Sequence, residues 1–137
     1  MAIAKKGTLL IVSGPKHDPE RKHLHVICND PDGDGNVALV SICSVTGMGH
    51  DTTCILQEHE HAFLKHESFV LYARAKIVRE SSLTNGVAAN LMVIQDDMNG
   101  QTFLRVLNGA CRSPQTPRKV KKYLGCVELK AEEASAA

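Results

Sequence analysis

Short apolar runs and period-two alternation dominate the first two thirds of the chain. At residues 23–28, Leu24, Val26 and Cys28 alternate with the other side chains, which is the pattern of a strand. Similar runs predict strands at residues 7–12, 23–28, 37–45, 53–56 and 68–79, with a further short strand within 86–95. Across the longest run, strict alternation would place the odd-numbered side chains on one face and the even-numbered ones on the other.

Turn-forming residues separate the second and third predicted strands. Asp30, Asp32 and Asp34, followed by Gly35, match the first half of a calcium-binding loop. The twelfth position of that motif requires a bidentate glutamate, but Ser41 occupies it. The flanking segments are strand-like rather than helical, so this cluster predicts a hairpin turn.

Helical signals are confined to the last third of the chain. An apolar stripe at helical spacing predicts a helix over residues 99–111, with Asp97 as its capping residue. Thr116 and Pro117 predict the start of a second helix, which would stop at Gly125.

Together these elements predict a mostly β fold in one domain. Five or six antiparallel strands would form a small twisted β-barrel, followed by two short C-terminal helices. The barrel would span residues 1–95, and the helices would extend the same domain over 96–126. Residues 127–137, rich in Ala and Glu, would form a flexible tail.

Composition narrows the classes of function. The chain has 137 residues, of which 16 are Lys or Arg and 15 are Asp or Glu, so its net charge is +1. This balance does not indicate a strongly basic nucleic-acid binder, although a local basic patch is compatible with it. Aromatic residues make up only 4%, which argues against a platform for base stacking. The sequence contains neither a membrane-length apolar run nor a signal-peptide pattern, so we expect a cytoplasmic protein.

The five cysteines do not form a recognisable framework. None belongs to a Cys-x-x-Cys pair, so a disulfide framework and a zinc knuckle are both disfavoured. Cys28, Cys43 and Cys54 lie within apolar runs. We expect them to be small core residues in a reducing compartment.

Seven histidines are the most unusual feature of the composition. His23 and His25 are two residues apart, as are His59 and His61, and His66 follows nearby. Paired imidazoles can bind zinc, can transfer protons near neutral pH, or can be solvated side chains without a role. The sequence leaves these alternatives open.

Basic residues gather at two places that could contact phosphate. Arg21 and Lys22 precede His23 where a polar loop meets a strand, and Thr46 follows the next long strand. The second cluster holds 5 of the 16 basic residues: Arg112, Arg118, Lys119, Lys121 and Lys122. Phosphate contact and a solvated surface are both possible interpretations of each cluster.

The order of the segments resembles the Kid/PemK/MazF-like toxins of bacterial toxin–antitoxin pairs. Residues 5–12 read Lys-Lys-Gly-Thr-Leu-Leu-Ile-Val, where those proteins have Lys-x-Gly-Asp and a hydrophobic strand. Residues 22–29 and 41–46 fit the next two strands, and 65–78 fits a late strand. An uncharacterised group of bacterial and phage proteins shares a similar pattern, and the resemblance covers about residues 5–83.

The resemblance implies an SH3-like barrel that cleaves single-stranded RNA without a metal or other cofactor, commonly as a homodimer with an antitoxin-like protein partner. The family's catalytic Arg and Thr would correspond to Lys22, or its neighbour Arg21, and to Thr46. A coherent mechanism would use His23 as acid or base. Either of two further histidines would supply the second proton-transfer group, namely His61 or His66. The candidate RNA-binding residues are Lys16, Lys65, Arg118, Lys119, Lys121 and Lys122.

The alternative is a barrel that has lost catalysis and binds nucleic acid or a protein. The family's Arg-Pro pair is replaced here by Lys22 and His23, which favours this alternative. The clustered histidines favour the enzyme.

Overall fold

The computed structural model describes residues 3–12 and 22–126. Its strands are β1 (Thr8–Val12), β2 (Lys22–Ile27), β3 (Asn36–Ser44), β4 (Ile55–Leu56), β5 (Ser68–Arg79) and β6 (Met92–Gln95). Its helices are the 3-10 turn η1 (Glu58–Glu60), α1 (Glu80–Ala88), α2 (Gly100–Arg112) and α3 (Arg118–Tyr123). In the described residues, no helix is long and apolar enough to cross a membrane.

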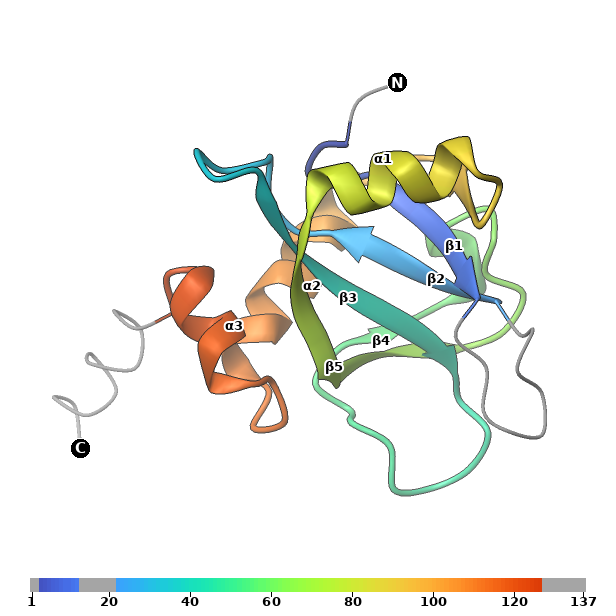
Figure 1. The fold of residues 1–137 in the computed structure, drawn as a ribbon. Helices are drawn as coiled ribbons and strands as arrows, with labels where there is room; N and C mark the ends of the chain where they lie inside the picture. Colours follow the sequence, from blue (N-terminus) through green and yellow to red (C-terminus); the bar gives the residue numbers. More distant parts are fainter. Residues whose placement is uncertain (1–2, 13–21, 127–137) are drawn as a thin grey trace, which may run out of the picture.

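All six strands form one antiparallel sheet in the order β4-β5-β3-β2-β1-β6. The sheet curves into a half-barrel (Figure 1). This confirms the predicted mostly β, barrel-like class with two short C-terminal helices. Because neighbouring strands are antiparallel, the start of β2, the end of β3 and the start of β5 lie at the same edge of the sheet.

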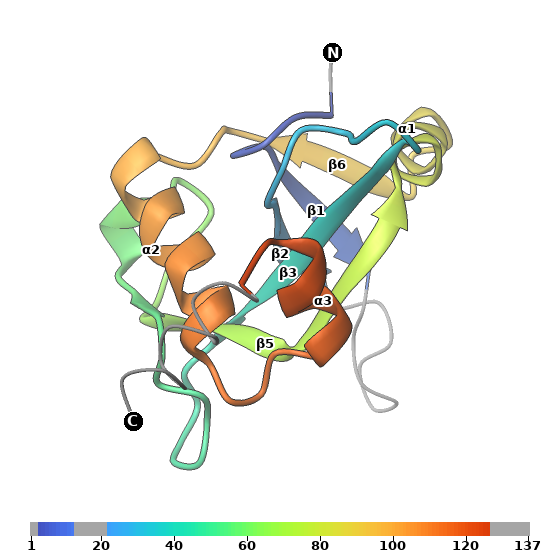
Figure 2. The ribbon, with the colours of Figure 1, turned by 90° about the vertical axis from the view of Figure 1, so that its left-hand side faces the viewer.

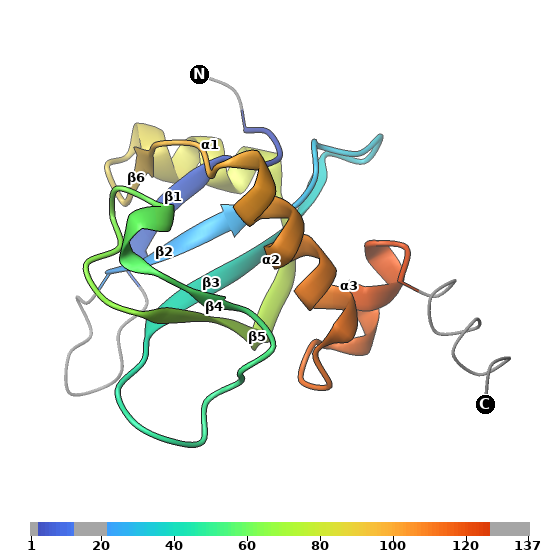
Figure 3. The same ribbon diagram turned by 180° about the vertical axis from the view of Figure 1, so that it is seen from behind.

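Both faces of the sheet are covered. The larger core lies under α2 and α3 and includes Val26, Val40 and Tyr72. The smaller core lies on the other face, where Leu83 of α1 packs with Leu39 and other apolar side chains. Figures 1 and 3 show α1 and α2 on opposite faces. Burial on both faces explains why the sequence of β3 is nearly all apolar or small.

The long strand β5 does not alternate throughout, so that prediction was wrong. Leu39 pairs with Lys76 and Ser41 with Leu71, so Val40 alone faces residues 72–75. This bulge shifts the side-chain alternation by one residue. Tyr72 is buried before it, whereas Ala75 is buried after it.

The helix α1 was missed by the sequence analysis, which placed a strand within 86–95. Its Ser82, Asn85 and Gly86 are weak helix formers. Its only fully buried apolar side chain is Leu83, so the helical stripe is narrow. Packing on the second core stabilises this helix more than its local sequence does.

Helix α2 lies very close to the side chain of Tyr72 on β5. The hydroxyl of Tyr72 donates a hydrogen bond of 2.7 Å to the carbonyl oxygen of Val106. A Cβ atom added at Gly109 would lie 2.1 Å from that hydroxyl oxygen, so only glycine fits there. The helix is capped by Asn99 rather than by Asp97, because the Asn99 side chain accepts from the first amides of the helix.

A disulfide joins Cys111 at the end of α2 to Cys126 after α3. The expectation that the cysteines form no disulfide was therefore wrong for this pair. The spacing of 15 residues gave no sequence signal, because the two sulfurs meet only after α3 folds back toward α2. Cys28 and Cys54 are buried thiols, as predicted, and burial raises the pKa of Cys28 to about 12.

The aspartate cluster between β2 and β3 is a hairpin turn, as predicted. One carboxylate oxygen of Asp32 accepts from the amides of Asp34 and Asn36, at 2.8 and 2.9 Å. Gly35 has a φ of 78°, which a turn of this kind requires. These bonds use the Asp32 side chain to hold the turn.

Candidate functional site

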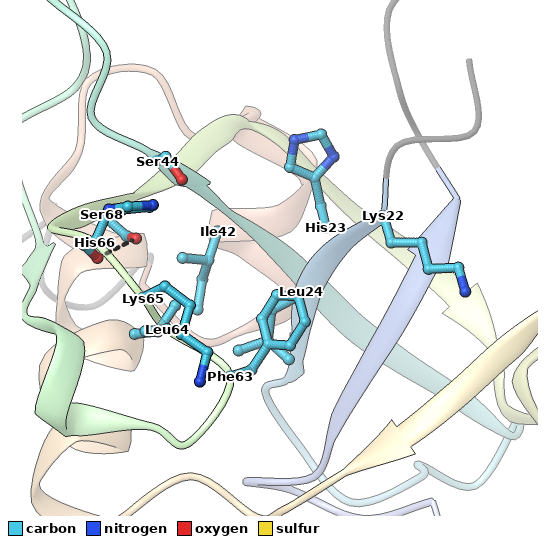
Figure 4. Close-up of a pocket in the computed structure, with 10 residues that line it drawn as sticks. All are labelled: Lys22, His23, Leu24, Ile42, Ser44, Phe63, Leu64, Lys65, His66 and Ser68. Carbon is cyan, nitrogen blue, oxygen red and sulfur yellow. Dashed lines mark hydrogen bonds between the residues drawn. The ribbon is translucent and has the colours of Figure 1, made fainter. Parts of the chain in front are cut away.

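A pocket of about 270 Å³ opens at the shared edge of β2, β3 and β5, and we call it the strand-end pocket (Figure 4). Its lining residues are Lys22, His23, Leu24, Ile42, Ser44, Phe63, Leu64, Lys65, His66 and Ser68. Two segments that are about forty residues apart in the sequence thus meet here. Of the predicted site residues, the strand-end pocket brings together Lys22, His23, Lys65 and His66.

Sheet pairing and one loop position these residues. Lys22 and His23 are the first residues of β2, whereas Lys65 and His66 lie just before β5. Ser44 at the end of β3 pairs with Ser68 at the start of β5. The Ser68 hydroxyl donates to the carbonyl oxygen of His66 at 3.0 Å, which holds the end of the loop against the sheet.

The strand-end pocket has an apolar floor and a polar rim. Figure 4 shows Leu24, Ile42, Phe63 and Leu64 at the centre, with His66 at one end and His23 at the other. The ring of His23 points away from the apolar floor. The Lys22 and Lys65 ammonium groups also point outward, on exposed side chains that can rotate toward a ligand.

A second pocket of about 280 Å³ lies on the face of the sheet that carries the smaller core, and we call it the outer-face pocket. Its lining residues are His23, His25, Ser41, Cys43, Leu71, Arg74 and Lys76. His23 lines both pockets, so the two adjoin at the start of β2.

Charge in both pockets has one sign. Among the described residues, neither Asp nor Glu lines the strand-end pocket or the outer-face pocket. The carboxylate of Glu67, which follows His66 in the sequence, accepts a hydrogen bond from Gln57 at 3.2 Å. Within the part of the chain that the structure describes, the linings of the two pockets thus hold cations and no carboxylate, an arrangement that favours binding of an anion such as phosphate.

His25 is the buried base of the outer-face pocket. Its Nδ1 lies 2.9 Å from the carbonyl oxygen of His23, and only a protonated nitrogen can donate to a carbonyl. In the neutral ring, Nε2 is therefore the acceptor. Burial, aided by the charges of Lys76 and His23, lowers the pKa of His25 to about 4, although its bond to the carbonyl acts in the opposite direction.

His61, predicted as a catalytic residue, lies outside both pockets. It is 6% exposed, and its Nε2 donates to the carbonyl oxygen of Asp96 at 2.6 Å while Nδ1 accepts from the amide of Phe63 at 3.0 Å. Both ring nitrogens are thus engaged in holding the loop before β5 against the end of β6. In this position His61 is a positioning residue for the loop that carries His66.

Thr46 is exposed two residues beyond β3 and does not line the strand-end pocket. Ser44 occupies the end of β3 instead. Arg21 and Lys16, the other two predicted residues of this region, lie outside the described residues.

The basic residues of α3 lie far from the strand-end pocket. Arg118, Lys119 and Lys122 are exposed, and Lys121 is half-buried. Tyr123 of the same helix is 2.7 Å from Asp32 in the β2–β3 hairpin, which is at the opposite end of β2 from Lys22. Figure 2 shows α3 beside that end of the sheet. Among the described residues, the predicted RNA-binding residues therefore form two separate groups, Lys65 at the strand-end pocket and the basic residues of α3.

Sequence reasoning did not assign Ser44, His25, Arg74 or Lys76 to a site. His25 carried a detectable signal, because it lies two residues from His23 on the same strand. Ser44 carried one too, because it ends β3, the strand that pairs with β2. Arg74 lies within the bulge and Lys76 follows it, so simple alternation did not predict which face their side chains occupy.

Within the described residues, no three His, Cys, Asp or Glu side chains are arranged to hold a metal ion. Comparisons with family models, with curated proteins and with solved structures found no match. The resemblance to Kid/PemK/MazF-like toxins, with its antitoxin-like partner and homodimer, therefore stays a prediction.

Proposed function

We propose that this protein binds single-stranded RNA across the strand-end pocket and cleaves it without a metal. The observation that carries the proposal is the meeting of His23 and His66 with Lys22 and Lys65 in one pocket that no carboxylate of the described residues lines. This combination contains the acid, the base and the cations that phosphodiester cleavage by an internal hydroxyl requires.

In the proposed reaction, one neutral imidazole removes the proton from a ribose 2′-hydroxyl. The 2′-oxygen attacks phosphorus, the bond from phosphorus to the 5′-oxygen breaks, and the second imidazole, in its protonated form, gives its proton to that oxygen. The products are a 2′,3′-cyclic phosphate and a 5′-hydroxyl. His23 and His66 fill the two proton-transfer roles, and Lys22 and Lys65 stabilise the charge on the phosphorane.

Cleavage of mixed-sequence RNA oligonucleotides by the full chain, in excess chelator, tests the proposal. His23→Ala and His66→Ala should each lower the rate by about 100-fold or more, the usual contribution of a general acid or base. The parent should leave 2′,3′-cyclic phosphate ends. It should not cleave an oligonucleotide built from 2′-deoxyribose, because the 2′-hydroxyl nucleophile is then absent.

His59→Ala is the matched control, since His59 is an exposed histidine of η1 and lies outside both pockets. Its rate should stay within twofold of the parent. If the parent leaves every RNA intact, or if His59→Ala is as impaired as His66→Ala, the proposed mechanism is wrong.

The second candidate is RNA binding without cleavage, and the strand order favours it. β3 lies between β2 and β5. Neighbouring strands are about 4.8 Å apart, so β2 and β5 are roughly 10 Å apart, and the backbones of His23 and His66 are at least that far from each other. This separation also allows the two histidines to contact neighbouring phosphates instead of one. Retention of RNA by the parent with no cyclic-phosphate product would support this candidate.

A further inference from the structure

The outer-face pocket combines exposed cations with a buried histidine, whereas a site for phosphate alone would need only the cations. Arg74 and Lys76 are exposed cations at its rim. His25 is 5% exposed and presents an acceptor nitrogen rather than a positive charge. Within the described part of the chain, its Nε2 makes no hydrogen bond.

The fold positions these groups from three strands. His25 of β2 pairs with Ser41 of β3, and β3 pairs with β5. The bulge in β5 spans residues 72–75, and Lys76 follows it directly. An extra stretch of this kind redirects side chains, and here Arg74 and Lys76 both line the same pocket.

The geometry points to a nucleotide subsite, in which His25 Nε2 accepts a hydrogen bond from an N–H group of the base and Arg74 and Lys76 bind the phosphate. This inference rests on the proposed function and deepens it. It places one nucleotide of the RNA in the outer-face pocket, next to the nucleotide whose phosphate is cleaved at His23. His23 joins the two pockets, so an RNA strand that crosses it would contact both.

A ligand that is only an anion does not fit this combination as well. Inorganic phosphate gains from the two cations, but it has no base that could fill the pocket beside His25 and donate an N–H group to Nε2. A nucleotide provides both an anion and N–H donors on its base. The volume of about 280 Å³ is close to the lower limit of ligand pockets, which suits one nucleotide.

Titration of the full chain with adenosine 3′-monophosphate, followed by NMR of the histidine rings, tests the subsite. The nucleotide should shift the His25 ring signals, and inorganic phosphate should bind at least fivefold more weakly. Arg74→Ala should weaken nucleotide binding about fivefold or more. Arg79→Ala is the matched control, because Arg79 is an exposed arginine of β5 outside both pockets, and it should change the affinity less than twofold.

His25→Phe should remove most of the preference for nucleotide over phosphate, whereas His25→Gln, which restores an acceptor oxygen, should regain part of it. Because His25 is buried, each variant is first compared with the parent by its amide NMR spectrum. Arg74→Ala gives an independent readout from an exposed position. If inorganic phosphate binds as tightly as the nucleotide, or if Arg74→Ala and Arg79→Ala behave alike, the inference is wrong.

These results are separable from those for cleavage. Nucleotide binding that depends on Arg74 and His25, without RNA cleavage, would support the subsite and contradict the ribonuclease. Cleavage that depends on His23 and His66, with no effect of the nucleotide on the His25 ring, would support the ribonuclease and contradict the subsite.

Discussion

The two basic regions of the molecule differ in what surrounds their charges. Around His23, cations line two adjoining pockets that contain no Asp or Glu among the described residues. On α3, the cations belong to a helix whose Tyr123 donates a hydrogen bond of 2.7 Å to Asp32 of the β2–β3 hairpin. Hydrogen bonds from the amide of Asn36 and from Tyr123 lower the pKa of Asp32, so its negative charge persists. We therefore expect phosphate to bind at the two pockets rather than at α3, because the pockets are concave and no Asp or Glu of the described residues lines them.

The two regions are also held differently, and the largest predicted effect follows from this. α3 is fastened by the Cys111–Cys126 disulfide, whereas the strand-end pocket is held by strand pairing. Replacing both cysteines by serine should lower the free energy of unfolding by about 3 kcal/mol, the usual value for a loop of about 15 residues. RNA cleavage should stay within twofold of the parent. Urea denaturation and the cleavage assay measure the two outcomes.

A reductant should destabilise the parent and leave the double serine variant unchanged, which provides the control. A loss of cleavage equal to that of His66→Ala, in a variant that remains folded, would show that the two regions are not independent.

Much of the sheet could be predicted from the sequence, because its strands are short apolar runs separated by turn formers. β2 is an example, since Leu24 and Val26 are both buried in the larger core as the alternation predicts. The bulge in β5 could not be predicted, because it is set by how β3 crosses β5 and not by any local pattern. Helix α1 was missed for a related reason, since its stability depends on packing against the second core.

The candidate site was predicted in part. His23 and His66 were identified because both lie where a polar segment meets a strand, and antiparallel pairing brings those positions to one edge. His61 was predicted for the same reason, but its ring is occupied by the backbone groups of Asp96 and Phe63. A histidine that satisfies buried backbone groups carries the same sequence signature as one that faces a ligand, so only the structure separates them.

Acid should weaken the fold through the pocket region, and this is the second largest predicted effect. His25 has a pKa of about 4 in the folded chain, whereas its ordinary value is 6.5. Between these values the unfolded chain binds more protons, so stability falls as the pH is lowered through this window. From pH 7 to pH 5 the loss from His25 alone should be about 2 kcal/mol.

Urea denaturation at both pH values, on the parent and on His25→Leu, isolates this contribution, because the variant should lose about 2 kcal/mol less than the parent. Asp32 sharpens the contrast between the two regions. The pKa of Asp32 in the folded chain is below its ordinary value of 3.8. Its contribution to stability is therefore kept between pH 7 and pH 5 and is lost as the pH falls from its ordinary pKa toward its folded pKa. Equal losses in parent and variant between pH 7 and pH 5 would show that His25 is not buried as a neutral ring.

The smallest predicted effect is the most direct test of the comparison. Each cation that contacts a phosphate of single-stranded RNA contributes about 0.7 to the slope of log affinity against log salt. Lys22→Gln with Lys65→Gln should therefore lower that slope by about 1.4, whereas Lys119→Gln with Lys122→Gln should leave it unchanged and alter the affinity less than twofold. Both pairs remove two charges from exposed lysines, so net charge cannot explain a difference between them. A slope that falls equally in both pairs would mean that RNA also contacts α3, and that the pockets are not the preferred phosphate site.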